Sequence, residues 1–498
     1  MAQTNRAVCR KIRQEAAGNQ SPAEGPVRCS AALAVLALAC MPLRAVACLP
    51  IQTTFSDAER AGIVSYWGAP GRYTVSIPDR NFGAPWQVRL TPEGSIWLHR
   101  YQQAIGAGKA PPTADPTAQT GGASAWKTWV SNKAAYDRWL AQQTATRLNA
   151  TVAAGTAPGD PVRSALPSRG AGRAGRADPP PESSLAAGVP PPGPMPADLL
   201  AAVGDPPSFA VATTPLQHTV TFDANDTYTY QDHTNVPATY AYYRFPQGVG
   251  TGGTPLPDAE RTALFNAAGL TDTQKRVMMA VSKFEGSFDA VNTYDTGYVS
   301  VGFIQFITLD DGRHSLADVL AHEKTDAPAD FERDFRRFGI DLTPDRVVVA
   351  VDPATGAELV GPDAVHKIVD DKRLIAVFQR AGRTSTSFRV AQIRVARENY
   401  WPEDDTITIT INGQSLTAKV ADIIKSESGL ATLFDRKVNR GSVLPLPEDV
   451  AKTMAAHNLT QLADDQRYEK EIVAACKYRG DFLADATLKQ PDNEPSRK

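Results

Sequence analysis

The chain has 498 residues, a length that corresponds to about three domains. Its 52 Lys and Arg residues nearly balance its 54 Asp and Glu residues, giving a net charge of −2, which argues against a basic nucleic-acid-binding protein. The mean hydropathy of −0.29 argues against a protein made of many membrane helices. Five cysteines are too few for a disulfide-stabilised scaffold.

Residues 1–47 have the organisation of a secretory signal peptide. A basic stretch precedes an apolar run over 31–40, and Ala45-Val46-Ala47 forms a small-x-small cleavage site. The apolar run is shorter than the roughly 20 residues that span a bilayer. Cys48 follows the cleavage site directly, as the lipid-bearing cysteine does in bacterial lipoproteins. We therefore expect an exported protein of the periplasm, cell envelope or medium, with Cys48 as a candidate membrane anchor.

Residues 48–150 are expected to form a small Trp-rich domain. A strand is predicted over 72–78, a hairpin over 87–98 with its turn at Pro92-Glu93-Gly94, and a helix over 126–148. Tryptophan rings stack on sugars in glycan-binding modules, but they also fill small cores, and we favour the core. Six of the seven tryptophans lie here: Trp67, Trp86, Trp97, Trp126, Trp129 and Trp139.

The next two regions differ sharply in composition. Residues 151–207 hold 13 of the 38 prolines, with much Ala and Gly, which predicts a disordered, semi-stiff tether. Residues 208–257 are predicted to be a β-rich extension with strands over 219–222, 227–230 and 240–243.

Three glycines in this extension match the G-x-G-x-x-G pattern of nucleotide-binding proteins. They are Gly248, Gly250 and Gly253. Prolines stand on both sides of the motif, so no helix N-terminus is available to hold a phosphate group. We therefore reject a nucleotide site.

Residues 258–490 are predicted to form a mainly helical domain with inserted hairpins, so we expect an α+β fold. Thr271 and Gln274 form a capping box, and apolar residues follow at helical spacing as far as Phe288. Hairpin turns are predicted over 352–356 and at Asn412-Gly413. Later helices are predicted over 372–400, 421–438, 446–457 and 464–486.

Candidate catalytic residues lie between 285 and 305. Glu285 stands at the end of a predicted amphipathic helix, where an apolar border favours a protonated carboxyl, as a general acid requires. Asp295 follows in a turn, and Ser300 in a short strand. Glycosidic cleavage requires such an acid and a second carboxylate that activates water or stabilises the sugar cation. Taken alone, an Asp before Thr-Gly is typical of a turn, and Asp289 is the rival second carboxylate.

This arrangement resembles the lysozyme-like superfamily. A helix-end Glu followed by a hairpin with Asp and Ser resembles bacteriophage-type lysozymes, and the stretch from Asp295 to Gly302 is similar to bacterial chitosanases. Gly302-Phe303-Ile304-Gln305 is similar to the Gly-x-x-Gln of lytic transglycosylases and goose-type lysozymes. A later segment, 435–441, resembles the Asn-x-Gly helix end of the phage enzymes.

The resemblance implies a hydrolase that cleaves β-1,4 bonds between the amino sugars of peptidoglycan. Glu285 would be the acid, Asp295 and Ser300 would position water, and Gln305 would line the cleft. Further candidates for contact with substrate are Tyr294, Tyr298 and Asn439. The alternatives are a lytic transglycosylase, a chitosanase and a non-catalytic wall-binding protein on the same scaffold. H-E-x-x-H and C-x-x-C motifs are missing from the sequence, so we expect no metal or other cofactor, and we expect a monomer.

Overall fold

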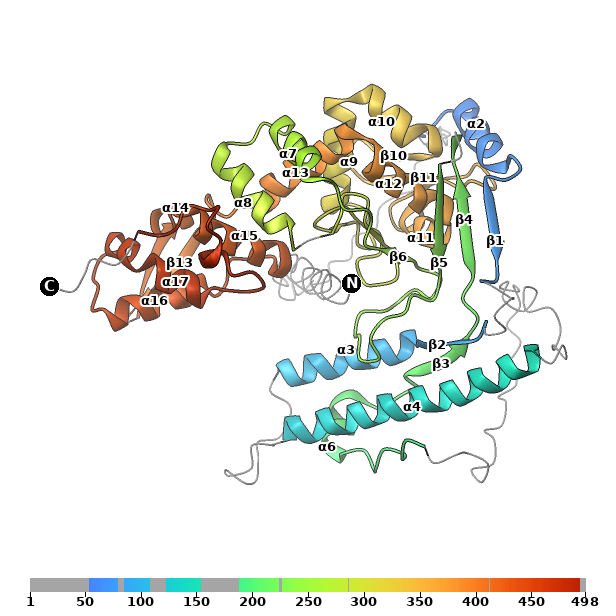
Figure 1. Cartoon of the computed structure of the whole chain (residues 1–498), viewed down its shortest axis with the longest axis horizontal. Coiled ribbons are helices and arrows are strands. Elements are labelled where there is room, and N and C mark those ends of the chain that lie inside the picture. The colour runs from blue at the N-terminus through green and yellow to red at the C-terminus, as the bar shows by residue number, and fades with distance from the viewer. Residues whose placement is uncertain are drawn as a thin grey trace, which may run out of the picture.

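The computed structural model describes residues 53–78, 85–107, 122–153, 188–223, 226–284, 286–411 and 413–492. The expected signal peptide, Cys48, most of the expected tether, Glu285 and Asn412 lie outside these residues. The described part is a mixed α and β structure, in which several small sheets lie among and beside the helices (Figure 1).

Two sheets join segments that are far apart in the sequence. In the first, β1 (Tyr73–Ser76) pairs with β4 (Gln217–Thr221), which pairs in turn with β5 (Thr227–Gln231). In the second, β2 (Gln87–Leu90) pairs with β3 (Ala210–Thr213). All these pairs are antiparallel. Residues before the Pro-rich stretch therefore share sheets with residues after it.

This pairing corrects the expected division into domains. The boundary between 48–150 and 208–257 is wrong, because strands of the two regions complete each other's hydrogen bonding. The last part of the expected tether is also packed: α6 (Ala197–Val203) buries two of its side chains, and the Trp129 Nε1–H donates to the Gly193 carbonyl at 2.9 Å.

A helical lobe contains one of the two main cores. Helices α3 (Pro92–Gly106) and α4 (Gly122–Ala153) lie side by side with α6 at the bottom of Figure 1. Their buried rings include Trp97, Trp126 and Trp129, which supports the prediction that tryptophans fill a core. Across the described residues, the long α4 included, no helix combines the length and apolar character needed to cross a membrane.

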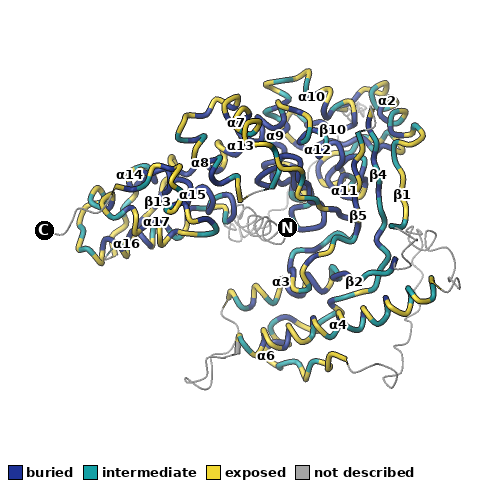
Figure 2. Tube along the Cα trace, viewed as in Figure 1, coloured by how far each residue is buried: buried dark blue, intermediate teal, exposed yellow. Residues whose placement is uncertain are grey.

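The larger core is formed by residues from early and late parts of the chain, from Phe55 to Leu488. The early helix α2 (Asp57–Gly68) inserts Trp67, whose Nε1–H donates to the Phe338 carbonyl at 3.1 Å. Buried residues are dense through this part of the molecule (Figure 2). Its helices are α7 (Asp258–Ala267), α8 (Asp272–Ser282), α9 (Ser315–Asp326), α10 (Pro328–Asp334), η4 (Arg336–Phe338), α11 (Pro362–Asp370), α12 (Lys372–Thr384) and α13 (Thr386–Tyr400).

Two further sheets belong to this part of the molecule. One has the order β6 (Gly250–Thr251), β7 (Val291–Asn292), β8 (Ser300–Val301) and β9 (Phe306–Ile307). The other contains β10 (Ile340–Leu342), β11 (Val348–Val351) and β12 (Glu358–Val360).

The C-terminal residues form a lobe at the left of Figure 1. A hairpin of β13 (Thr406–Ile411) and β14 (Gln414–Lys419) contacts helix α16 (Leu446–Ala456). Helix α15 (Glu427–Arg440) is buried along most of its length and packs on α8. The remaining elements are α14 (Val420–Ile423), η5 (Leu462–Tyr468), α17 (Glu469–Ala475) and η6 (Phe482–Ala484).

Several local predictions are confirmed and others are wrong. The helices predicted over 372–400 and 421–438 are each divided in two, and the helix predicted over 464–486 is divided into η5, α17 and η6. The strand over 72–78, the helix over 126–148 and both later hairpins are present. The hairpin over 87–98 is wrong, because Thr91 caps α3 and Pro92 occupies its first turn, where its missing N–H costs nothing. The strand over 240–243 is also wrong: this segment makes one isolated bridge, and its tyrosines enter the lobe core.

Candidate functional site

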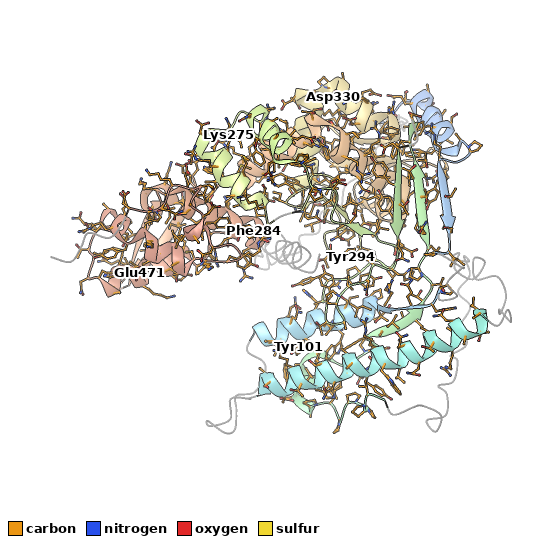
Figure 3. The ribbon with its side chains drawn as sticks, viewed as in Figure 1. Tyr101, Lys275, Phe284, Tyr294, Asp330 and Glu471 are labelled. Atoms are coloured by element: carbon orange, nitrogen blue, oxygen red, sulfur yellow. The ribbon has the colours of Figure 1, made fainter. Side chains whose placement is uncertain are left out.

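A pocket opens at the sheet β6–β9, where the two cores meet. It has a volume of about 300 Å³. Val291 on β7 belongs to the larger core, and Tyr294, three residues later, belongs to the core of the helical lobe. Figure 3 shows Tyr294 between that lobe and the rest of the molecule. Ligand pockets favour such junctions.

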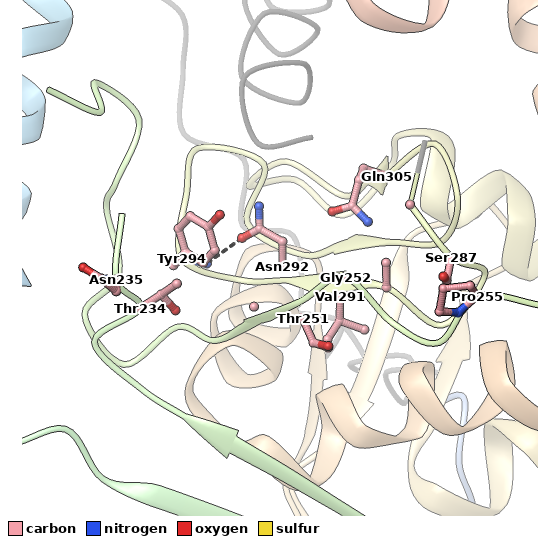
Figure 4. Close-up of a pocket in the computed structure, with 13 residues that line it drawn as sticks. Thr234, Asn235, Thr251, Gly252, Pro255, Ser287, Val291, Asn292, Tyr294 and Gln305 are labelled. Atoms are coloured by element: carbon pink, nitrogen blue, oxygen red, sulfur yellow. Dashed lines mark hydrogen bonds between the residues drawn. The ribbon is translucent and has the colours of Figure 1, made fainter. Parts of the chain in front are cut away.

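The described residues that line the pocket are all uncharged. The polar ones offer hydroxyl and amide groups (Figure 4): Thr234, Asn235, Thr251, Ser287, Asn292, Tyr294 and Gln305. The others are small or apolar: Gly250, Gly252, Pro255, Gly286, Ala290 and Val291. Because hydroxyl and amide groups both donate and accept hydrogen bonds, this lining suits a neutral, hydroxyl-rich ligand better than an ion.

The glycine-rich stretch shapes one wall of the pocket. A Cβ at Gly250 would lie 2.6 Å from a ring carbon of Tyr294, and one at Gly248 would lie 2.3 Å from the Thr293 carbonyl oxygen. The glycines therefore allow β6 to approach β7 closely. No helix begins directly after them, since α7 starts at Asp258, so the stretch lacks the architecture of a nucleotide site.

Helix α8 leads toward the pocket. Its predicted capping box is confirmed: the Gln274 N–H donates to Thr271 Oγ1 at 3.2 Å, and the Thr271 N–H donates to Gln274 Oε1 at 3.1 Å. The helix ends at Ser282, before the predicted Phe288, which lies in a turn. Glu285 is outside the described residues. After it, Gly286 lines the pocket and donates its N–H to the Phe303 carbonyl at 2.9 Å.

Asp295 is fully buried and is not among the described lining residues. Its carboxylate accepts hydrogen bonds from the Tyr240 hydroxyl at 3.0 Å, the Asn292 amide at 2.8 Å and the Gly297 N–H at 2.9 Å. The bond to the backbone two residues later is the turn chemistry of aspartate. The structure therefore does not bring Asp295 to the pocket, where it was expected to position water.

Ser300 is also fully buried, on β8 opposite Asn292. Within the described part of the chain its hydroxyl oxygen has no hydrogen-bond partner, and it does not line the pocket. Asp295 and Ser300, which were expected to act together on water, are thus both buried and neither reaches the pocket.

Two of the predicted substrate-contacting residues do line it, Gln305 and Tyr294. Gln305 has a left-handed backbone with φ of 57° and donates from Nε2 to the Gly302 carbonyl at 2.9 Å. Left-handed conformations of residues other than glycine are uncommon and cluster at functional sites.

Tyr298 and Asn439 lie elsewhere. The Tyr298 ring packs 4.9 Å from Phe245 and 5.4 Å from His366. Asn439 is fully buried in α15 and donates to the Asp435 carboxylate at 3.1 Å. Neither lines the pocket. Asn439 therefore fixes the end of a helix rather than reaching a ligand there.

The rival carboxylate, Asp289, borders a neighbouring cavity of about 260 Å³ that shares Pro255 with the pocket. It is 2% exposed, and it accepts hydrogen bonds from the Thr254 N–H at 2.7 Å and from Arg383 Nε–H at 3.2 Å. Its oxygens are thus engaged in holding the loop before α7 against α12.

No family model, curated protein or solved structure matches this chain. The site is therefore interpreted from its own geometry. Among the described residues, His, Cys, Asp and Glu side chains form no cluster of three or more that would suit a metal ion.

Sequence reasoning missed the other polar lining residues. Asn292 is a clear example. It lies three residues before Asp295, and the sequence analysis assigned the positioning of water to that carboxylate instead. The signal that was available is the density of glycines from 248 to 253, which marks a close approach of backbones. That approach places Gly250 opposite Asn292 and Thr251 opposite Val291.

Proposed function

We propose that this protein cleaves the β-1,4 bonds between amino sugars in peptidoglycan, with Glu285 as the general acid. The observation that carries the proposal is the uncharged, hydroxyl- and amide-lined pocket that begins at Gly286, the residue directly after Glu285. Sugar hydroxyl and N-acetyl groups pair with such side chains. The lysozyme-like resemblance of this stretch of sequence supports the same chemistry.

In this proposal each side chain has a defined task. Glu285 protonates the oxygen of the bond that breaks, a step that requires a protonated carboxyl. Asn292 and Gln305 bind sugar hydroxyl or acetamido groups and so hold the sugar ring in place.

The burial of Asp295 favours one of the alternatives, a lytic transglycosylase. A two-carboxylate hydrolase needs its second carboxylate at the sugar, whereas Asp295 is bonded to three donors behind the sheet. A lytic transglycosylase uses one acidic residue, and an internal hydroxyl of the sugar attacks in place of water. The product then has an anhydro end instead of a reducing end.

Export to the cell envelope belongs to the same proposal. It rests on the signal-like organisation of residues 1–47 and on Cys48 after the cleavage site, and peptidoglycan is located where such a protein would arrive. The net charge near zero agrees with a partner that is not a nucleic acid.

The deciding experiment measures clearing of a suspension of purified peptidoglycan by residues 49–498. Wild type is compared with Glu285→Gln, which removes the acid at nearly constant shape. Glu448→Gln is the matched control, because Glu448 is exposed on α16 away from the pocket. Circular dichroism confirms that the variants fold. We expect clearing by wild type and the control, and at least a thousandfold loss with Glu285→Gln.

Product analysis then separates the reactions. Reducing ends identify hydrolysis, and anhydro ends identify transglycosylation. Activity on chitosan but not on peptidoglycan would instead support a chitosanase. If wild type clears neither polymer yet sediments with peptidoglycan as tightly as Glu285→Gln does, the protein binds the wall without cleaving it, and the proposal fails.

A further inference from the structure

A second large cavity lies away from the pocket at the sheet β6–β9, to which the proposed glycan cleavage is assigned. It is bounded by residues 53–54, by the last two turns of α9, by η4 and by the turn between β10 and β11. Its volume is about 590 Å³. The glycan proposal does not use this cavity.

The described side chains that line it include three cations and no carboxylate. The carboxylates that pair with these cations lie outside the lining: Asp341, Glu59, Glu332 and Asp318. The cations come from three different elements: Lys324 from α9, Arg336 from η4 and Arg346 from the β10–β11 turn. Four threonines add hydroxyl groups: Thr53, Thr54, Thr325 and Thr343. The Thr325 hydroxyl donates to the Ala321 carbonyl at 2.8 Å, so it offers the cavity only an acceptor. Cations and hydroxyl donors that converge on one space suit an oxyanion.

Two of the cations are held in place from behind. Asp341 is fully buried and binds Lys324 Nζ at 2.5 Å with one oxygen and Arg336 with the other. Arg336 also binds Glu59 at 2.8 Å. Because these contacts fix both side chains, little rotamer freedom remains to be lost when a ligand binds.

The third cation has spare binding capacity. The Arg346 side chain is 64% exposed, and its guanidinium lies 3.6 Å from Asp318, beyond hydrogen-bonding distance. Its backbone is left-handed, with φ of 59°, and its N–H donates to the Thr343 carbonyl at 2.9 Å. A tight turn therefore holds an arginine in a disfavoured conformation at the rim of the cavity, as is common at ligand-binding sites.

We infer that this cavity binds a phosphate group carried on a small hydroxyl-bearing molecule. Cations from three directions match the several oxygens of a phosphate better than the two oxygens of a carboxylate. The cavity has room for more than a phosphate, and its threonines offer partners to the hydroxyl groups of the attached body. Free phosphate and a phosphate monoester share this chemistry, and the experiment distinguishes them.

The test is calorimetric titration of the full chain with inorganic phosphate, with a hexose 6-phosphate and with the same hexose without phosphate. We expect the sugar phosphate to bind more tightly than inorganic phosphate, the neutral hexose not to bind, and affinity to fall as salt rises. Arg346→Ala should weaken binding about tenfold or more, since it removes a charge-assisted hydrogen bond.

Two more variants keep the result interpretable. Lys324→Gln removes a charge while retaining a donor to Asp341, so it should weaken binding without unfolding the protein. Arg397→Ala, an exposed arginine on α13 outside the cavity, should bind as wild type does. Glu285→Gln should also bind normally, so the outcome does not depend on the glycan proposal.

Two results would overturn the inference. One is the failure of both phosphate ligands to bind wild type. The other is equal weakening by Arg346→Ala and Arg397→Ala, which would show attraction to the protein's general charge instead of binding in the cavity.

Discussion

The Asp295 carboxylate accepts a hydrogen bond from the Asn292 side-chain amide at 2.8 Å, and it is Asn292 that lines the pocket. The Asn292 side-chain oxygen Oδ1 in turn accepts from the Tyr294 backbone N–H at 3.1 Å. Both ends of this amide are thereby oriented. In the proposed function Asp295 would therefore act through Asn292, because a buried acceptor sets which face of the amide is offered to a ligand.

Replacing Asp295 tests this positioning role. Asp295→Asn retains one acceptor oxygen, so we expect kcat/KM for peptidoglycan to fall by less than about tenfold. Asp295→Ala leaves three buried donors without an acceptor and should lower the free energy of unfolding by about 1–3 kcal/mol. Steady-state kinetics and urea titration measure both effects. If Asp295→Asn were as inactive as Glu285→Gln, Asp295 would take part in the reaction itself.

Asn292→Ala should act mainly on binding. We expect KM for soluble glycan fragments to rise about three- to tenfold, with a smaller change in kcat, because one hydrogen bond to the sugar is lost. Asn266→Ala, an exposed asparagine on α7, is the control and should leave both constants unchanged. An unaltered KM in Asn292→Ala would remove this residue from the substrate site.

Gly250 provides a stability prediction. In Gly250→Ala the new methyl group would meet the Tyr294 ring, so we expect a loss of about 1–3 kcal/mol in the free energy of unfolding. Gly62→Ala is the matched control, because that position on α2 has open space around it, and it should gain about 0.5–1 kcal/mol from helix propensity. Equal stability of the two variants would contradict the close approach of β6 to Tyr294.

The buried carboxyl of Glu323 should make the stability of the fold depend on pH. Burial and the neighbouring Asp334 raise its pKa to about 8, and its Oε1 accepts from the Ser385 hydroxyl at 3.2 Å. The folded protein therefore holds a proton that the unfolded chain releases near pH 4.5. Keeping Glu323 protonated stabilises the folded state, and this stabilisation is complete below pH 4.5. It is lost as pH rises toward 8, so the free energy of unfolding falls by up to about 1.4 kcal/mol per pH unit.

The variant Glu323→Gln should remove this slope. Asp334 and Asp330 face the carboxyl, with Arg333 and Arg380 bound to Asp334, so the neutral amide avoids repulsion at high pH. Melting temperatures from pH 5 to 8 measure the effect. Glu448→Gln should follow the wild-type curve, and a wild-type slope that persists in Glu323→Gln would assign it to another group.

Local signals in the sequence predicted local structure well. The capping box of Thr271 and Gln274 depends on residues three apart, and β13 pairs with β14, the next strand along the chain, so each feature is specified within a short window. The Thr91-Pro92 pair carried a helix-start signal of the same kind, but the following Gly94 led to a turn interpretation instead. Here the information was present and was misinterpreted.

Long-range pairing could not be predicted in this way. β2 meets β3 through a register that sets Gln87 opposite Thr213, and neither strand contains a feature that identifies the other. The candidate site shows the same limit. Gln305 and Tyr294 were found from residue type near Glu285, whereas Thr234 and Asn235 reach the pocket from a distant segment whose position depends on those pairings.

The pairing of strands across residues 154–187 has a consequence for how the polypeptide can be divided. Because β1 and β2 are hydrogen-bonded to β4 and β3, and Trp67 lies in the larger core, a protease cut between 154 and 187 would sever one covalent connection and leave those contacts intact. Two separately produced fragments, 53–153 and 188–492, should therefore recombine into a split protein, and each piece would supply surface that the other needs to complete its fold.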